Sequence, residues 1–420
     1  MTEDRKPKFF YGYVVVLAAF GIWLTVWGTS MTYGIFFKPM LSEFGWTRAT
    51  TAGARSLCSG VAGLLGIVAG GLTDKFGPRR VVLIFGSFLG IGYLLMSQIS
   101  NTWQFYLVYG MLIGIGWSAA TIPTLTTVAR WFVKRRGLMT GMVQAGSGMG
   151  GMVLPPLAGW LILTQGWRPA YLVLGIIALV LIMLSGLFLR RDPSQKGQLP
   201  YGADEITGQG TKNQGPSLQI TEFSPREAIR TKQFWMLSIM LFGFGFCRSA
   251  TLVHIAAHVT DLGFSLTIGA NMIAVISGAS IVGRIGMGRL ADIIGNRKAI
   301  MIGYIVIAAD LLWILAAHEL WMLYLFAAAF GFSWGTLAVI RMPLIAEVFG
   351  LGSLGAILGT LELGASTGSI IGPFLAGWLF DVTGEYAAAF LVTAAVAIIG
   401  LVLTILLRPI GSQERGQQRP

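Results

Sequence analysis

The sequence predicts an all-α membrane protein with twelve transmembrane helices, arranged as two pseudo-symmetric six-helix halves. Three observations support this fold class: the composition, the spacing of long apolar runs, and a pattern that occurs twice. Of the 420 residues, 55% are hydrophobic and only 11% are charged. A soluble domain carries about 25% charged residues, so lipid rather than water is the expected solvent for this surface.

Twelve apolar runs reach the roughly 20 residues that a membrane-spanning helix needs. Arg5, Lys6 and Lys8 precede the first run, which we interpret as a spanning helix and not as a cleavable signal peptide. The expected helices cover residues 12–37, 50–72, 80–98, 103–127, 138–162, 169–189, 234–258, 266–289, 299–317, 321–346, 354–378 and 386–407.

Positive charge is unevenly divided between the two sets of loops. Of the 30 Lys and Arg residues, 23 fall in the segments on one side, whereas only Lys38, Arg48 and Arg168 fall on the other. Cytoplasmic loops carry such an excess, so both termini are expected in the cytoplasm of a bacterium with this chain in its inner membrane. The net charge of +12 has the same explanation. No nucleic-acid partner is expected, because no basic patch is interleaved with stacking aromatics.

One polar segment interrupts the apolar runs. Residues 190–233 are rich in Gly, Gln, Ser and Pro, a composition typical of a flexible linker. We expect this cytoplasmic linker to join an N-terminal half, residues 1–189, to a C-terminal half with a short tail, residues 234–420. Residues 225–232 are a candidate short helix on the membrane surface.

The two halves share a loop pattern at a constant offset of 218 residues. Gly70, Leu72, Asp74, Gly77, Arg79 and Arg80 recur as Gly288, Leu290, Asp292, Gly295, Arg297 and Lys298. Agreement at six positions indicates an internal duplication, and two repeated halves around a midplane site are an architecture of transporters. We expect both loops to act as latches that close the cytoplasmic side; solvated turns with topogenic charges are the alternative.

These loops and the fifth predicted helix resemble a known family. GGLTDKFGPRR (70–80) and GRLADIIGNRK (288–298) are similar to the loop signature of the major facilitator superfamily. RWFVKRRGLMTGMVQAGSGMGG (130–151) is similar to the fifth-helix signature of its monocarboxylate transporter branch. Bacterial members also resemble FFYGYVVVLAAF, GIFFKPMLSEFGW, VHIAAHVTDLGFS and GPFLAGWLFDVTGEY.

The resemblance implies a secondary carrier with the major facilitator fold. It implies a small organic anion as substrate, such as lactate, pyruvate or a related carboxylate, moved by alternating access with a symported proton. We expect no cofactor and no metal, because no nucleotide-binding loop and no ligand spacing is present. A monomer in the lipid bilayer is the expected functional form. An exporter of amphipathic drugs or siderophores and a non-transporting sensor are the alternatives.

Ionisable residues inside the predicted spans are candidate functional residues, because charge at the bilayer centre is costly. They are Arg55, Arg248, Arg284, Asp310, Arg341 and Glu362. Arg55 lies in the outer half of its helix and is expected to reach the membrane interface.

Arg284 is the main candidate for binding the substrate. Its guanidinium is always charged and can hold a carboxylate through two parallel hydrogen bonds. The resemblance implies this role, since carriers of this branch bind the substrate carboxylate with an arginine at this point of the eighth helix. Ser277 and Ser280 share its helical face. An ion pair with Glu362 is the alternative.

Arg341 and Glu362 either neutralise each other as an ion pair or act separately, as a second carboxylate site and a proton carrier. Trp334 precedes Arg341 by seven residues, which places both on one helical face. The tryptophan is therefore either a cavity residue or packing.

The roles of Arg248, His254 and His258 and the identity of the proton carrier also remain open. Arg248 is either a third cavity arginine, which would favour a larger or multiply charged acid, or a partner of Asp310.

His254 and His258 lie four residues apart and titrate near neutral pH, so they are candidates for proton coupling or an ordinary hydrogen-bonded pair. Animal monocarboxylate carriers have a lysine where Met31 stands and an aspartate where Ser280 stands. The proton is therefore expected on Glu362, His254 or Asp310, or on the substrate itself, unless the carrier exchanges anions without net proton movement.

Overall fold

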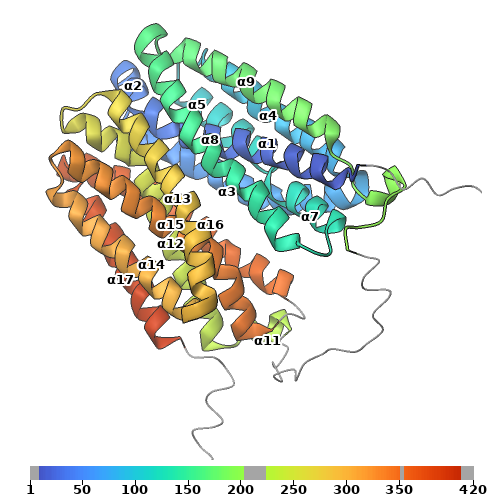
Figure 1. Ribbon diagram of the computed structural model, residues 1–420. Coiled ribbons are helices and arrows are strands. Elements are labelled where there is room, and N and C mark those ends of the chain that lie inside the picture. Colours follow the sequence, from blue (N-terminus) through green and yellow to red (C-terminus); the bar gives the residue numbers. More distant parts are fainter. Residues whose placement is uncertain (1–8, 203–223, 351–353, 408–420) are drawn as a thin grey trace, which may run out of the picture. The chain divides into compact units, whose positions relative to one another are not determined.

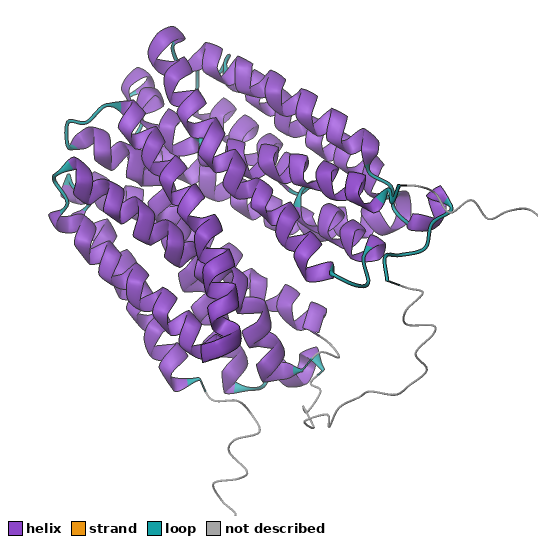
Figure 2. Ribbon diagram, viewed as in Figure 1, coloured by secondary structure: helices purple, strands orange, loops and turns teal. Residues whose placement is uncertain are grey.

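The computed structural model describes residues 9–202, 224–350 and 354–407. These residues form helices joined by short loops, and no β-strand occurs among them (Figure 2). The chain divides into two compact units. The first unit comprises Met1–Ser30, Val61–Leu154 and Leu161–Gln214, and the second unit comprises Met31–Gly60, Pro155–Trp160 and Gly215–Pro420.

The helices follow one another with few residues between them (Figure 1). In chain order they are α1 (Gly12–Met31), α2 (Tyr33–Phe44), α3 (Arg48–Phe76), α4 (Pro78–Met96), α5 (Thr102–Phe105), the π-helical η1 (Tyr106–Ile113), α6 (Gly114–Trp117), α7 (Thr121–Trp131), α8 (Arg136–Gln165), α9 (Trp167–Phe188), the 3₁₀ turn η2 (Pro193–Lys196), α11 (Pro225–Ile229), α12 (Lys232–Asp261), α13 (Leu266–Ile294), α14 (Asn296–Trp313), the 3₁₀ turn η3 (Ile314–Ala316), α15 (Leu320–Phe349), α16 (Leu354–Thr383) and α17 (Ala387–Leu406).

Twelve segments of the described chain are long and apolar enough to span a membrane. Most are single helices. The first, Gly12–Phe44, joins α1 to α2, and the fourth, Thr102–Trp131, joins the elements from α5 to α7. Each of the twelve predicted runs overlaps one of these segments, so the predicted all-α fold with twelve transmembrane helices is confirmed.

Glycines with a left-handed backbone repeat at the offset of 218 residues. The pairs are Gly45 and Gly263, Gly77 and Gly295, and Gly166 and Gly384, and every φ among them lies between 65° and 92°. Residues with a β-carbon rarely adopt this conformation. The same turns therefore end or begin equivalent helices in both halves of the chain, as the duplicated loop pattern predicts.

Glycines also let paired helices touch through their backbones. In the first unit, β-carbons at Gly146 or Gly150 of α8 would collide with the carbonyl oxygens of Phe20 or Leu24 of α1. The counterparts in the second unit, Gly364 and Gly368 of α16, stand in the same way against α12. This small-residue contact is the usual means of close packing between membrane helices, and it explains the spaced glycines of the fifth-helix signature.

The start of the predicted linker is hydrogen-bonded to the first unit. The side chain of Gln198 accepts a hydrogen bond from the amide of Tyr11 (3.0 Å) and donates one to the carbonyl of Phe9 (2.9 Å). The amide of Tyr201 donates to the carbonyl of Trp131 (2.9 Å). These bonds hold residues up to Tyr201 on the first unit. There the ring of Tyr201 packs against the rings of Phe10 and Phe132.

The structure describes only part of the remaining linker. Residues 203–223 lie outside the described residues. The predicted short helix before the seventh span is present as α11 (Pro225–Ile229). It begins with a capping box in which Ser224 and Glu227 satisfy each other's backbone amides.

Candidate functional site

An ion pair links two spans of the second unit. Nη1 of Arg341 in α15 lies 2.7 Å from Oε1 of Glu362 in α16, and the two side chains are 31% and 37% exposed. Of the two interpretations left open by the sequence, the structure shows this contact. A guanidinium has five N–H donors, so the pair does not exhaust the binding capacity of Arg341.

Three more arginines share the electrostatic environment of this pair. The charges of Arg55, Arg284, Arg341 and Glu362 all act on the guanidinium of Arg248. We call these five residues the arginine cluster. The cluster comprises four guanidinium groups and one carboxylate within the spans of one unit. Because guanidinium groups bind carboxylates through paired, charge-assisted hydrogen bonds, the cluster is suited to an anionic ligand.

The structure bears on the sequence-based interpretations of two members of the cluster. Arg55 is only 6% exposed and donates to Oγ of Ser59 (2.7 Å), so the expected reach to the membrane interface is wrong. Its helix carries it into the protein. Nη2 of Arg248 lies 3.4 Å from Oγ of Ser369, and the described contacts do not include the considered pair with Asp310.

Arg284 lies beside Trp334, and both are predicted substrate-binding residues. Its Cζ is 5.6 Å from the centre of the indole ring, within range of a cation–π attraction. Trp334 is itself buried. Ser280 is also fully buried, and its hydroxyl donates to the carbonyl of Ser277 (2.7 Å). The hydroxyl proton of Ser280 is therefore engaged in a hydrogen bond within α13 in this conformation.

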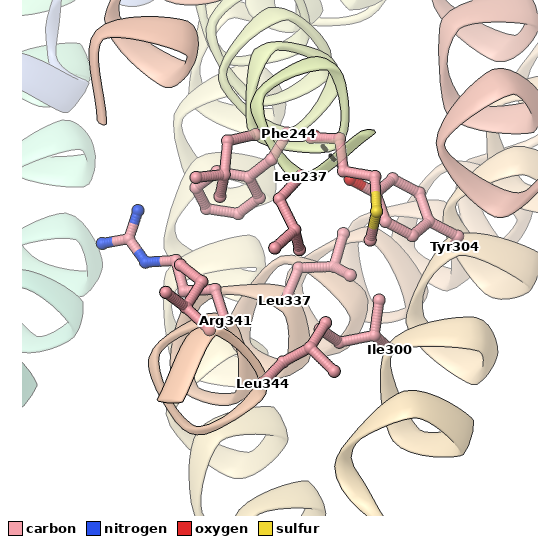
Figure 3. A pocket seen from close by; sticks show the side chains of 10 residues that line it. Leu237, Phe244, Ile300, Tyr304, Leu337, Arg341 and Leu344 are labelled. Carbon is pink, nitrogen blue, oxygen red and sulfur yellow. Dashed lines mark hydrogen bonds between the residues drawn. The ribbon is translucent and has the colours of Figure 1, made fainter. Parts of the chain in front are cut away.

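An apolar pocket adjoins Arg341 in the second unit. α12, α14 and α15 supply its walls, including Leu237, Phe244, Ile300 and Leu337. Cζ of Arg341 is 5.5 Å from the ring centre of Phe244. Figure 3 shows the Arg341 guanidinium pointing away from the apolar side chains. Arg341 thus belongs to both the pocket and the arginine cluster.

A second polar network joins the beginning of α3 to the ends of α12 and α16. Arg48 bonds the carboxylate of Asp261 (2.6 Å) and the hydroxyl of Tyr386, and its Cζ lies 3.6 Å from the ring centre of Phe380. Lys38 pairs with the same Asp261 (2.9 Å). We call Lys38, Arg48, Asp261, Asp381 and Tyr386 the Arg48 network.

Asp381, near the C-terminal end of α16, caps the N-terminal end of α3. Its two oxygens accept hydrogen bonds from the backbone amides of Arg48 (2.9 Å) and Ala49 (2.7 Å). The first amides of a helix have no partner within the helix, and a negative charge is favourable there. Gly377 allows the approach, because a β-carbon there would lie 2.8 Å from the carbonyl oxygen of Arg48.

His254 is bound to this network through both ring nitrogens. Nε2 lies 2.9 Å from the carbonyl oxygen of Pro373, and Nδ1 lies 3.1 Å from the Tyr386 hydroxyl. A carbonyl can only accept, so Nε2 carries the proton and Nδ1 accepts from Tyr386. Burial raises the pKa of Tyr386 well above its usual value, so its hydroxyl keeps the proton that it donates.

Sequence reasoning did not identify the Arg48 network, because Lys38 and Arg48 were counted only as topology signals. A signal was available. They are two of just three basic residues placed on the side poor in positive charge. Exceptions to such an asymmetry need another explanation, and acidic residues on the same side, such as Asp261 and Asp381, are the partners to look for.

Asp310 and His258 lie outside the arginine cluster. Asp310 in α14 is 6% exposed, and its Oδ2 has no hydrogen-bond partner among the described residues. His258 packs against the rings of Tyr386 and Phe390, with centroids 5.7 and 5.0 Å away. The described residues contain no group of His, Cys, Asp and Glu able to hold a metal ion.

The two duplicated loops make different contacts. In the first unit, Asp74 pairs with Arg130 (2.8 Å), which also reaches Asp192 (3.3 Å). In the second unit, Arg297 donates to the carbonyls of Thr404 (3.0 Å) and Ile405 at the end of α17, where a positive charge is favourable. Arg79, Arg80, Asp292 and Lys298 are exposed.

Comparison with known proteins agrees with this architecture. The model of the Major Facilitator Superfamily matches residues 18–309 and 277–420. The fold of a bacterial homolog of the human lysosomal transporter Spinster, in an inward-facing and unoccupied conformation, is similar with a TM-score of 0.75 at 15% identity, over 96% of this chain and 97% of that one. The chain therefore belongs to the major facilitator superfamily, and it is a transporter of that superfamily.

Curated relatives place the chain more narrowly. Monocarboxylate transporter 13 of Rattus norvegicus is 30% identical over 96% of this chain and 91% of its own length. Monocarboxylate transporter 11 of Homo sapiens is 28% identical over 94% of this chain and 82% of its own length. The uncharacterized MFS-type transporter YhjX of Escherichia coli is 27% identical over 83% and 86%. The resemblance to the monocarboxylate transporter branch is thus confirmed.

Proposed function

We propose that this protein is a secondary carrier of an organic carboxylate and that the arginine cluster binds the substrate. The observation that carries the proposal is the gathering of Arg55, Arg248 and Arg284 around the Arg341–Glu362 ion pair within the spans of the second unit. Arg284 and Arg341 each can hold a carboxylate through paired hydrogen bonds, and Arg248 adds a third positive charge. The names of the monocarboxylate transporters among its relatives support the same substrate class.

Of the three proton candidates, Glu362 is the one that lies within the arginine cluster. A proton on Glu362 would free Arg341 from its partner and raise the positive charge that meets the substrate. His254 belongs to the Arg48 network, and Asp310 lies in α14. We therefore assign the symported proton to Glu362, so that a carboxylate and a proton cross together with little net charge.

Alternating access requires a closure on each side of the membrane. Arg48 and Asp74 stand near opposite ends of α3, so their polar networks belong to opposite membrane faces. With the N-terminus in the cytoplasm of a bacterial inner membrane, the Arg48 network closes the outer side. The loops of Asp74 and Asp292, with Arg79, Arg80, Arg297 and Lys298, close the inner side.

Uptake into proteoliposomes tests the site. Radiolabelled pyruvate and lactate are supplied with an inward proton gradient to wild type, Arg284→Ala and Arg289→Ala. Arg289 is the matched control, because it lies on α13 and is exposed. Truncating one partner of a desolvated charge pair costs about 2–5 kcal/mol, so uptake by Arg284→Ala should fall at least about thirtyfold. Normal uptake by this variant would remove Arg284 from the site.

A further inference from the structure

A chain of hydrogen bonds joins His254 to Arg48. Nε2 of His254 donates to the carbonyl of Pro373, and its Nδ1 accepts from the hydroxyl of Tyr386. The oxygen of the same hydroxyl accepts from the guanidinium of Arg48. The two ends fix the direction of the chain, because a carbonyl can only accept and a guanidinium can only donate. His254 is therefore neutral in this arrangement, with its proton on Nε2.

A second proton, on Nδ1 of His254, would break this chain. Protonated histidine donates through both ring nitrogens, so the oxygen of Tyr386 would face two donors and its own proton would lose its acceptor. His254 and Tyr386 are 1% and 3% exposed, and the ring of Phe37 packs edge-on against His254, with centroids 5.0 Å apart. At such burial the loss of a hydrogen bond is costly, so the closed chain excludes the proton.

Charged groups of several helices surround His254. Arg48 of α3 and Asp381 of α16 both act on its ring, but the two oxygens of Asp381 already accept from backbone amides at the start of α3. The other charged or titratable groups of this region, on α12 and α2, are His258, Asp261 and Lys38. A positive charge on His254 would compete with Arg48 for one acceptor, the oxygen of Tyr386.

The Arg48 network joins the two halves of the sequence. Arg48 belongs to the first half, whereas His254, Asp381 and Tyr386 belong to the second. Separation of the two would bring the ring of His254 to water, where it is free to take up a proton. Because a ligand favours the state that binds it better, protons favour the open form of the network.

We propose that His254 is a proton-sensitive positioning residue of the outer closure. Neutral His254 holds Tyr386, which positions Arg48 against its partners, and protonated His254 releases both. The inference rests on the proposed function for the place of the Arg48 network in the outer closure. It is separate from the symported proton, which is assigned to Glu362, because acid opens the network whether or not a proton crosses the membrane.

The distance between two spin labels tests this inference. The labels are attached at Ser42→Cys of α2 and at Glu385→Cys, which are exposed positions in the first and second halves of the sequence. The full-length protein in lipid nanodiscs is measured from about pH 8 to about pH 5, the range in which histidine ordinarily titrates. Protein with only the native Cys58 and Cys247, which are both buried, is the blank.

Acid should move the labels apart. One proton that binds only to the open form changes the ratio of open to closed molecules by up to about tenfold per pH unit. Over the whole range this ratio should therefore rise at least about tenfold. Each sample is also measured with Glu362→Gln, so that the proposed symported proton does not supply the response.

Matched variants separate titration from structure. Glutamine in His254→Gln keeps one donor and one acceptor and has no titratable group, so the ratio should stay low and independent of pH. His318→Gln removes an exposed histidine and should respond as the wild type does. Tyr386→Phe keeps the ring and removes the hydroxyl, so it should raise the open population even at the highest pH.

The outcomes distinguish this inference from the proposed function. If the ratio in the wild type is independent of pH, or if His254→Gln responds to acid as the wild type does, His254 is not a proton-sensitive residue, and the proposed carrier and its substrate site stand. If the labels keep one distance even in Arg48→Ala, the Arg48 network is not the outer closure, and that part of the proposed function is wrong as well.

Discussion

The arginine cluster and the Arg48 network are both built from ion pairs in the second unit, yet their charges are balanced differently. The cluster comprises four arginines and one carboxylate, that of Glu362. In the Arg48 network, Lys38 and Arg48 face Asp261 and Asp381, and Phe380 lies against the guanidinium. Opposite charges satisfy one another within the Arg48 network, whereas the proposed role of the arginine cluster is to bind an anionic substrate.

The arginines of the main ion pair in each region also differ in exposure. The side chain of Arg48 is 12% exposed, against 31% for Arg341. Water weakens an ion pair and leaves a partly exposed one worth little to stability, whereas the loss of one partner from a desolvated pair is costly. We therefore expect the loss of Arg48 to cost more stability than the loss of the pair between Arg341 and Glu362.

The largest effect on stability is expected for Arg48→Ala. The change removes the bonds to Asp261 and Tyr386 and the contact with Phe380, and it leaves the carboxylate of Asp261 without this partner. The free energy of unfolding should fall by about 2–3 kcal/mol, seen as a lower unfolding temperature of the purified protein.

Arg48→Lys separates charge from shape in the same assay. Lysine keeps the charge but lacks the planar fork and the flat face, so its unfolding temperature should lie between those of wild type and Arg48→Ala. An unfolding temperature of Arg48→Ala equal to that of wild type would show that the network does not hold these helices.

A smaller effect on stability is expected for Glu362→Gln. The carboxylate is 37% exposed, so losing its pair with Arg341 should cost less than about 1 kcal/mol. The effect on transport should be large: pyruvate should still bind, but a proton gradient should no longer drive its accumulation. Counterflow exchange in the same proteoliposomes is the control that shows intact binding and movement.

This variant also tests the contrast between the regions. If Glu362→Gln destabilised the protein as much as Arg48→Ala, the arginine cluster would be a structural network like the other. If accumulation against the gradient continued, the proton would be carried elsewhere.

The sequence was sufficient for the fold because lipid imposes simple rules. Run length and composition identified all twelve spans of the described chain, and the repeated loop anticipated the matching glycine turns such as Gly77 and Gly295. Positions along single helices were likewise informative: Arg248, Arg284, Arg341 and Glu362 were identified because charge is rare in spans.

Tertiary contacts between distant segments could not be obtained in this way. Arg48 and Asp381 are 333 residues apart, and neither local sequence indicates that the two residues are in contact. Arg55 was expected at the interface, but only the packing around α3 shows that it is buried near Arg248. The apolar pocket beside Arg341 depends on three helices at once and has no linear signature.

The most direct test of the central claim compares acids with uncharged molecules of the same shape. Thermal unfolding of the wild-type protein in detergent is followed with pyruvate and lactate and, separately, with pyruvamide and lactamide. A ligand at 100 times its Kd stabilises the folded state by about 2.7 kcal/mol. If the arginine cluster binds a carboxylate, the acids should raise the unfolding temperature and the amides should not. Equal stabilisation by an acid and its amide would contradict carboxylate recognition by the arginine cluster.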